Sequence, residues 1–178
     1  MPVVPGQTVV HPHHGPSTVD TVFTRTVKGA KVSYARLQVL GQDLTVAVPV
    51  DMLDEVGVRD VMDLDRIGTI FEVLVAESLP FEKVWSRRMK SAQDRVATGD
   101  LLKVAEVVRD LRRREEEPGI SFGERTLMRD ALLPLVSELA IGLEIDEEAA
   151  DQMVDRAILE QVSPDLTPAA RATLAPAS

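Results

Sequence analysis

The hydrophobic pattern of this sequence changes once along the chain, and the change divides it into two parts of different fold class. From Thr8 to Val48, apolar residues alternate with polar ones and β-branched residues are frequent, which is typical of half-buried strands. Beyond residue 60, apolar residues recur at helical spacing, as in Ile67, Ile70 and Phe71. The pattern therefore predicts a β-domain followed by an all-helical domain.

The first part is predicted to contain short, closely spaced strands. Lys28-Gly29 is typical of a hairpin turn between two of them, because glycine adopts positive φ at no steric cost. Four or five strands within about 50 residues favour a small antiparallel barrel of the SH3 or Tudor type. In order, the predicted strands cover about residues 7–11, 18–27, 32–40 and 44–48.

Five amphipathic helices are predicted in the second part. Two of their starts carry N-cap signals: Ser121 is followed three residues later by Glu124, as in a capping box, and Asp146 precedes two acidic residues that favour a first helical turn. In order, the helices lie around residues 67–78, 82–97, 100–114, 122–139 and 147–158.

The C-terminal end shows no periodic pattern. From Ser163 onward it contains three prolines and many alanines, and we expect it to be disordered. The predicted fold class is therefore α+β, a small antiparallel Tudor/SH3-like barrel followed by an all-helical domain of about five helices. The predicted segments are a β-module at residues 1–55, a connector at 56–63, a helical domain at 64–163 and a tail at 164–178.

Composition narrows the chemistry that is open to this chain. It has no cysteine, which excludes disulfides, thiol nucleophiles and thiolate-bound zinc or iron–sulfur centres. It lacks a basic start followed by an apolar leader, and no apolar stretch reaches about 18 residues, so we expect a cytoplasmic protein. Aromatic residues make up only 3% of the chain, so we expect an aliphatic core.

Charge is distributed unevenly along the chain, whose net charge is −9. Residues 1–60 carry five basic and six acidic side chains, residues 61–114 eleven and nine, and residues 115–178 four and fourteen, which gives the segments −1, +2 and −10. Exposed charges are screened over about 8–10 Å at physiological salt. An acidic whole chain therefore does not exclude a local basic surface that binds nucleic acid.

Three histidines, His11, His13 and His14, cluster around Pro12 and Gly15. Adjacent side chains of an extended segment point to opposite faces, so at most two of them converge without help, and a turn is favoured over a metal site. The sequence gives no sign of a nucleophile that would pair with these histidines. The ten glycines are scattered as turn residues, so there is no glycine-rich phosphate-binding loop. We therefore expect neither an enzyme nor a cofactor or metal site.

The segment from Lys83 to Lys90 holds the single tryptophan, Trp85, among four cations. Cations three or four residues apart on a helix share a face that suits DNA phosphates, and an aromatic beside them can stack on a base or wedge between base steps. An alternative stays open at this point. Trp85 falls in helical register with Met89 and Ala92, so it could instead end a buried stripe with the cations as a solvated rim.

A second basic run, at Arg109 and Arg112 to Arg114, is weaker evidence for a nucleic-acid surface. It is followed at once by Glu115 to Glu117, at the predicted end of a helix. Cations at that position suit the helix dipole. An ordinary charged helix end is the favoured interpretation.

Short segments in a fixed order carry a family resemblance over roughly residues 3–140. They are TVV at 8–10, PHHG at 12–15, TRT at 24–26, KG at 28–29, DLTV at 43–46, VP at 48–49, VGVRD at 56–60, WSRR at 85–88, GD at 99–100 and KVAEVVRDL at 103–111. In this combination the chain resembles the CarD family of bacterial transcription regulators, also called CdnL, and its actinobacterial members in particular.

The resemblance implies a Tudor-like module that docks on the β subunit of RNA polymerase and a helical domain that meets promoter DNA. In that family a tryptophan of the WSRR segment enters the minor groove at the upstream edge of the transcription bubble and stabilises the open complex. Because this chain has few residues that read base edges, we expect little sequence specificity. A global regulator of this kind would work on the nucleoid through the polymerase, near the σ factor. The residues implied are Trp85 as the wedge, Arg87, Arg88 and Lys90 as phosphate contacts, and Arg25, Thr26, Val27 and Ala47 in the polymerase-facing surface.

The chain departs from the family pattern at the position of Ala47, where relatives tend to carry an arginine. Loss of that cation bears on the strength of polymerase docking. Together with the acidic last third, it keeps a second hypothesis open, a protein-only adaptor on RNA polymerase whose helical domain binds another protein instead of DNA.

Overall fold

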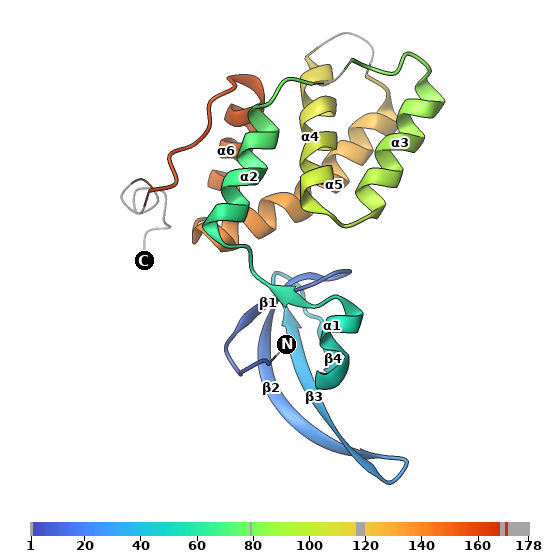
Figure 1. The fold of residues 1–178 in the computed structure, drawn as a ribbon, viewed down its shortest axis with the longest axis vertical. Helices are drawn as coiled ribbons and strands as arrows, with labels where there is room; N and C mark the ends of the chain where they lie inside the picture. The colour runs from blue at the N-terminus through green and yellow to red at the C-terminus, as the bar shows by residue number, and fades with distance from the viewer. Residues whose placement is uncertain (1, 79, 117–119, 168–169, 171–178) are drawn as a thin grey trace. The chain divides into compact units, whose positions relative to one another are not determined.

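A computed structural model of the chain describes residues 2–78, 80–116, 120–167 and 170. Its contacts divide the chain into two compact units, residues 1–61 and 62–178. The first unit holds the strands and one short helix, and the second holds five helices among its described residues (Figure 1). The predicted α+β class is thus confirmed. Most of the predicted tail, residues 164–178, lies outside the described residues.

The N-terminal unit is a five-stranded antiparallel sheet with the strand order β4-β3-β2-β1-β5. Its apolar face packs under a small helical segment made of a 3-10 turn at Val50–Met52 and the helix α1 at Leu53–Val56, from which Leu53 is fully buried. The strands are β1 (Thr8–His11), β2 (Gly15–Val27), β3 (Ala30–Val39), β4 (Thr45–Pro49) and β5 (Arg59–Asp60).

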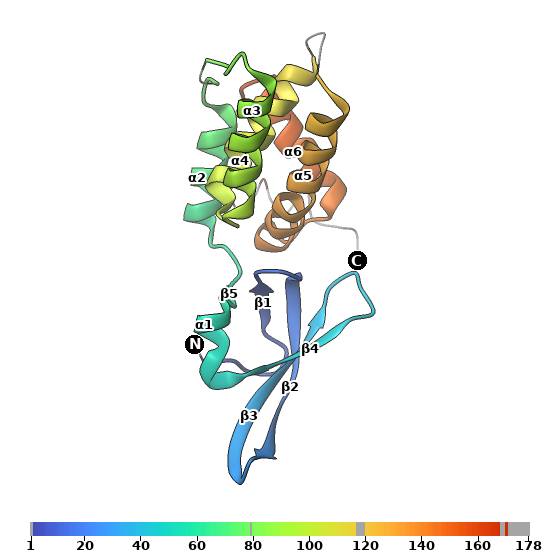
Figure 2. The ribbon, with the colours of Figure 1, turned by 90° about the vertical axis from the view of Figure 1, so that its right-hand side faces the viewer.

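The hairpin of β2 and β3 extends beyond the rest of this sheet (Figure 2). On β3 the partner strand β4 reaches only to Tyr34, and on β2 the partner strand β1 reaches only to Thr18. The predicted turn closes the hairpin, because Lys28 and Gly29 both adopt positive φ, at 50° and 83°. Most side chains near the hairpin tip are consequently exposed.

The predicted connector, residues 56–63, differs from the structure over much of its length. Val58 is buried in the core of the sheet, and the two residues of β5 pair with Val9 and Val10 of β1. These residues therefore belong to the N-terminal unit. A two-residue strand is too short to show an alternating pattern, which is why the sequence did not reveal it.

In the C-terminal unit, α4 contacts all four of the other helices. Its buried stripe of Leu101, Val104 and Val108 meets α2, α5 and α6 in one aliphatic core, whose only aromatic member is Phe71. None of the helices in the described ranges is long and apolar enough to cross a membrane. The helices are α2 (Leu64–Val75), α3 (Trp85–Ala97), α4 (Leu101–Glu115), α5 (Phe122–Leu143) and α6 (Glu147–Leu159).

The helix α3 is attached to the unit by a smaller apolar cluster than its neighbours. Ala92 is its only fully buried residue, and it packs with Val107 and Leu111 of α4 and Met128 of α5. Burial of one alanine side chain stabilises a helix much less than burial of a leucine stripe does. Polar contacts at the start of α3 therefore carry much of its attachment.

The three histidines lie at the turn between β1 and β2, as predicted. The His11 ring is buried, its Nδ1 accepts the backbone N–H of His13 at 3.2 Å, and its ring centroid lies 4.6 Å from that of His14. Burial and the neighbouring histidines His14 and His13 lower the pKa of His11 below its usual value. The fold thus favours the neutral form of this imidazole.

We predict that the N-terminal unit loses stability as the pH falls through 6.5, the ordinary pKa of histidine. The unfolded chain then binds a proton at His11 that the folded chain does not, so acid favours unfolding. Denaturant unfolding at a series of pH values measures this. The matched control is His11→Asn, which keeps an acceptor near the Nδ1 position and should show a flatter dependence between pH 7.5 and 5.5. Identical pH dependence in both proteins would contradict the assignment.

Candidate nucleic-acid interface

The predicted wedge residue Trp85 is the first residue of α3, and its side chain is about half exposed, at 51%. Its indole Nε1 donates a hydrogen bond to the hydroxyl of Ser121 at 3.1 Å. Met89 and Ala92, which share its helical register, turn partly or fully inward. Trp85 therefore does not end the buried stripe as a core residue; it stands at the surface with one edge of its indole fixed.

Ser121 is the N-cap of α5, and the capping box predicted from the sequence is present. The Ser121 hydroxyl accepts the Glu124 N–H, and the Glu124 carboxylate accepts the Ser121 N–H at 2.9 Å. Capping fixes the first turn of α5. The hydroxyl that holds the indole is thereby itself held in place.

The Glu124 carboxylate also joins α5 to α3. It is only 1% exposed, and it accepts a hydrogen bond from Arg88 Nε at 2.7 Å. Arg88 in turn donates to the Glu82 carbonyl at 2.7 Å and lies over the Phe81 ring. The sequence prediction gave Arg88 a phosphate contact, but in the fold its guanidinium is committed to these internal partners and orients the start of α3.

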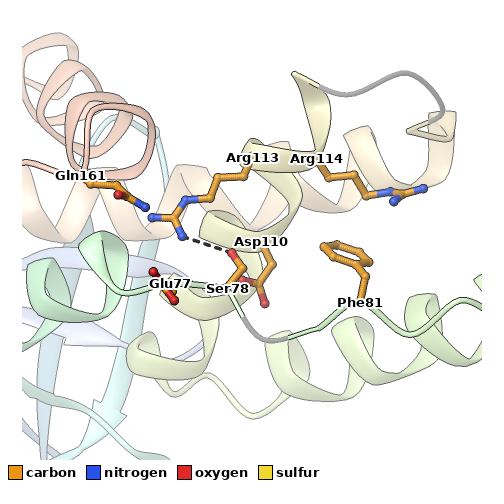
Figure 3. A pocket seen from close by; sticks show the side chains of 7 residues that line it. All are labelled: Glu77, Ser78, Phe81, Asp110, Arg113, Arg114 and Gln161. Carbon is orange, nitrogen blue, oxygen red and sulfur yellow. Dashed lines mark hydrogen bonds between the residues drawn. The ribbon is translucent and has the colours of Figure 1, made fainter.

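Phe81 also lies near Arg114, whose guanidinium is 4.9 Å from the ring centroid (Figure 3). The Arg114 Nε is 3.7 Å from the same Glu124 oxygen. Two arginines from α3 and α4 thus share one carboxylate and one aromatic ring. This arrangement fixes the loop before α3 as well as the helix.

Burial alone would raise the pKa of Glu124, but hydrogen bonds from Ser121 and Arg88 outweigh it and hold that pKa below its usual value. The stabilisation from this carboxylate is therefore present above its ordinary pKa and is lost as the pH falls through the lowered folded-state value. At neutral pH the group is charged and fully engaged.

The other predicted phosphate contacts, Arg87 and Lys90, lie on the solvent side of α3. Both are exposed, and Lys90 makes an i,i+4 ion pair with Asp94 at 3.4 Å in which both side chains are mostly exposed. Such surface pairs contribute about 0–1 kcal/mol and exchange readily for a phosphate. Both cations line a shallow groove between α3 and α4, to which Arg95 and Lys103 add two more.

The start of α3 differs from the starts of the other helices of its unit. In the described part of the chain no side chain caps it, whereas Asp63, Asp100, Ser121 and Asp146 cap the others. A helix N-terminus without a side-chain cap favours anions.

The arginines at the end of α4 bind groups within the C-terminal unit. Arg113 donates to the carbonyls of Leu74, Val75 and Ala76 at the end of α2 and of Ile158 on α6, and to the Ser78 hydroxyl (Figure 3). Arg112 makes a bidentate pair with Asp155, and Arg109 is buried against Asp110. These arginines link α4 to α2 and α6, whereas the sequence predicted only an ordinary charged end of one helix.

The predicted polymerase-facing residues lie on the hairpin and on β4. Arg36 of β3 is paired with Ala47, and residues paired in register share a face of the sheet. By the same pairing Arg25 and Val27 lie on that face, whereas Thr26, paired with Lys31, lies on the other. The structure thus brings three of the four predicted residues to one face.

Three residues of that face were missed by the sequence analysis. The rings of Phe23 and Tyr34 stack with centroids 5.7 Å apart, and the guanidinium groups of Arg36 and Arg25 lie 5.2 and 6.0 Å from the Phe23 ring. We call this set (Phe23, Arg25, Tyr34 and Arg36) the aromatic-arginine face. These residues are neighbours only because of the register between the strands. That register could not be read from the sequence, so the face was not predicted.

We predict that Glu124→Gln lowers the free energy of unfolding by about 3 kcal/mol, because the mostly buried guanidinium of Arg88 then lacks its counter-charge. The single tryptophan reports the change directly, as its emission should shift at a lower denaturant concentration. The matched control is Glu106→Gln on α4, which removes a more exposed carboxylate paired with Arg95 of α3 and should cost less than about 1 kcal/mol. Equal effects of the two variants would contradict the assigned role of Glu124.

Two family models match the chain, each over one of its two units. The model of the CarD-like/TRCF RID domain matches residues 4–62, and the model of the CarD C-terminal domain matches residues 69–155. A protein of Bacillus subtilis (strain 168) named "Putative transcription factor YdeB" is 26% identical over 143 residues, which cover 80% of this chain and 94% of that protein. The chain therefore belongs to the CarD family of transcription regulators, which act in association with RNA polymerase.

Proposed function

We propose that this chain docks on the β subunit of RNA polymerase through its N-terminal sheet and stabilises the open promoter complex by placing Trp85 at the upstream edge of the melted DNA. The observation that carries the proposal is the state of Trp85: half exposed at the first residue of a helix, with its indole Nε1 bound to Ser121. An aromatic held in one orientation loses little conformational freedom when it stacks on a base.

The surroundings of Trp85 support a DNA contact. Arg87 and Lys90 are exposed on the same helix, and no side chain caps the first turn in the described part of the chain. These donors suit phosphates and fix the position of a protein on DNA without reading its sequence. Arg88 contributes indirectly in this proposal, because its bond to Glu124 sets the position of the indole.

The mechanism is differential binding. A protein that contacts the junction of duplex and melted DNA better than closed DNA shifts the closed-to-open equilibrium by the difference in its affinity for the two states. Base–aromatic stacking is worth about 1–3 kcal/mol, which corresponds to a shift of about 5- to 150-fold. So small a contact is sufficient when docking on the polymerase supplies a high local concentration.

The aromatic-arginine face is the surface we assign to the polymerase. It presents two stacked rings between two cations, and aromatics and arginines are the residues that contribute most to protein interfaces. Arg36 lies directly across from Ala47, so the face keeps a cation beside the position where relatives tend to carry one. Its exposed ion pair with Asp20, at 3.6 Å, is weak enough to exchange for a partner carboxylate.

We predict that Trp85→Ala shortens the lifetime of open promoter complexes by about 5-fold or more, because it removes the stacking surface. The measurement is the decay of polymerase–promoter complexes after a competitor challenge, with the full-length protein present. Binding of the variant to polymerase should be unchanged. An unchanged lifetime at full polymerase occupancy would exclude the wedge.

Footprinting of the same complexes separates this function from the protein-only adaptor. Altered reactivity of the DNA at the upstream bubble edge, dependent on the protein, supports DNA contact. If polymerase binds the protein but the footprint is the same with and without it, the adaptor is the correct function.

We predict that Arg36→Glu weakens binding to RNA polymerase core enzyme by about 10-fold or more, because it places a like charge against a partner surface that accepts cations. The matched control is Lys31→Glu, an equal charge reversal at an exposed residue on the other face of the same hairpin, which should bind normally. Equal losses for both variants would mean that net charge, and not the aromatic-arginine face, governs docking.

A further inference from the structure

Phe122 is the most exposed large apolar side chain in the described part of the molecule, at 80%. It is the first residue of α5 and directly follows Ser121, whose hydroxyl binds the indole of Trp85. Single apolar residues at a surface are common and need no explanation. Phe122 differs from them because its backbone neighbour is bonded to the proposed DNA-contacting residue.

The first turns of α3 and α5 are in contact at this point. Besides the bond from Trp85 to Ser121, Gly123 of α5 lies close to Met89 of α3. A Cβ atom built on this glycine would be only 3.7 Å from the Met89 methyl group. Val84, the N-cap of α3, is also exposed, at 46%. Three exposed apolar side chains, Val84, Trp85 and Phe122, therefore occur where these two helices begin.

Charge beside these side chains favours one kind of occupant. Lys83, directly before Val84, and Arg87, two residues after Trp85, are exposed, and the start of α3 carries no side-chain cap among the described residues. Cations and an uncapped helix start attract phosphates, and exposed rings attract bases. A single-stranded nucleic acid supplies both phosphates and bases.

We propose that Phe122 is a second base-stacking residue, which with Trp85 forms a two-ring platform for adjacent nucleotides of the melted promoter strand. Trp85 is fixed by Ser121, and the backbone of Phe122 is fixed by the capping box of α5. The same contacts therefore fix the indole of Trp85 and the backbone from which the Phe122 side chain extends. This inference rests on the proposed function and adds to it a residue that lies outside both the WSRR segment and the groove lined by Arg87 and Lys90.

Open-complex lifetime tests the platform with four full-length variants. We expect Phe122→Ala to shorten the lifetime by about 5-fold, the lower end of base–aromatic stacking. The matched control is Leu133→Ala, which removes another exposed apolar side chain, 64% exposed, from the middle of the same helix and should leave the lifetime unchanged. In the double variant Trp85→Ala with Phe122→Ala, the open-complex lifetime should shorten by less than the product of the two single fold-changes, because adjacent stacked bases act together.

The outcomes separate this inference from the function on which it rests. If Trp85→Ala shortens the lifetime and Phe122→Ala does not, the platform is wrong and the proposed function stands. If neither variant shortens it, both fail. A photoreactive phenylalanine analogue at position 122 adds a direct reading: crosslinks to promoter DNA at the upstream bubble edge support the platform, and crosslinks to polymerase alone overturn it.

Discussion

The buried carboxylate of Glu124 is the contact on which the candidate DNA surface depends. It closes the capping box of α5, binds Arg88 of α3 and lies near Arg114 of α4, so one charged group joins three helices. Breaking a buried ion pair leaves an uncompensated charge in a low-dielectric site and costs about 3–5 kcal/mol. Because breaking the Arg88–Glu124 pair would cost this free energy, the polar contacts at the start of α3 stay in a single arrangement.

This dependence follows from how little apolar surface α3 buries. With Ala92 as its only fully buried residue, the helix leaves Arg87, Lys90 and Trp85 exposed to solvent, and hydrophobic burial alone does not fix its position. The indole-to-Ser121 bond and the Arg88–Glu124 pair supply the missing constraint. A DNA-contacting surface gains from this design, because a ring that is already oriented gives up little freedom on binding.

Local signals in the sequence predicted much of the fold. The hairpin at Lys28-Gly29, the capping box at Ser121 and the cap at Asp146 each depend on residues within a few positions of one another, and each is present. Contacts between distant segments were not predictable in this way. Arg88 meets Glu124, and Arg113 meets the end of α2, across more than thirty residues of chain, and nothing in the local pattern distinguishes these arginines from solvated ones.

The central claim is that Trp85 stacks on promoter DNA at the upstream edge of the bubble. The most direct measurement is the fluorescence of 2-aminopurine placed at that edge, in open complexes formed with and without this protein. Stacking of an indole on the probe changes its emission, so we expect a protein-dependent change that disappears with Trp85→Ala while polymerase binding persists. The same change with the variant, or no change with the unaltered protein, would contradict stacking of Trp85 on the DNA.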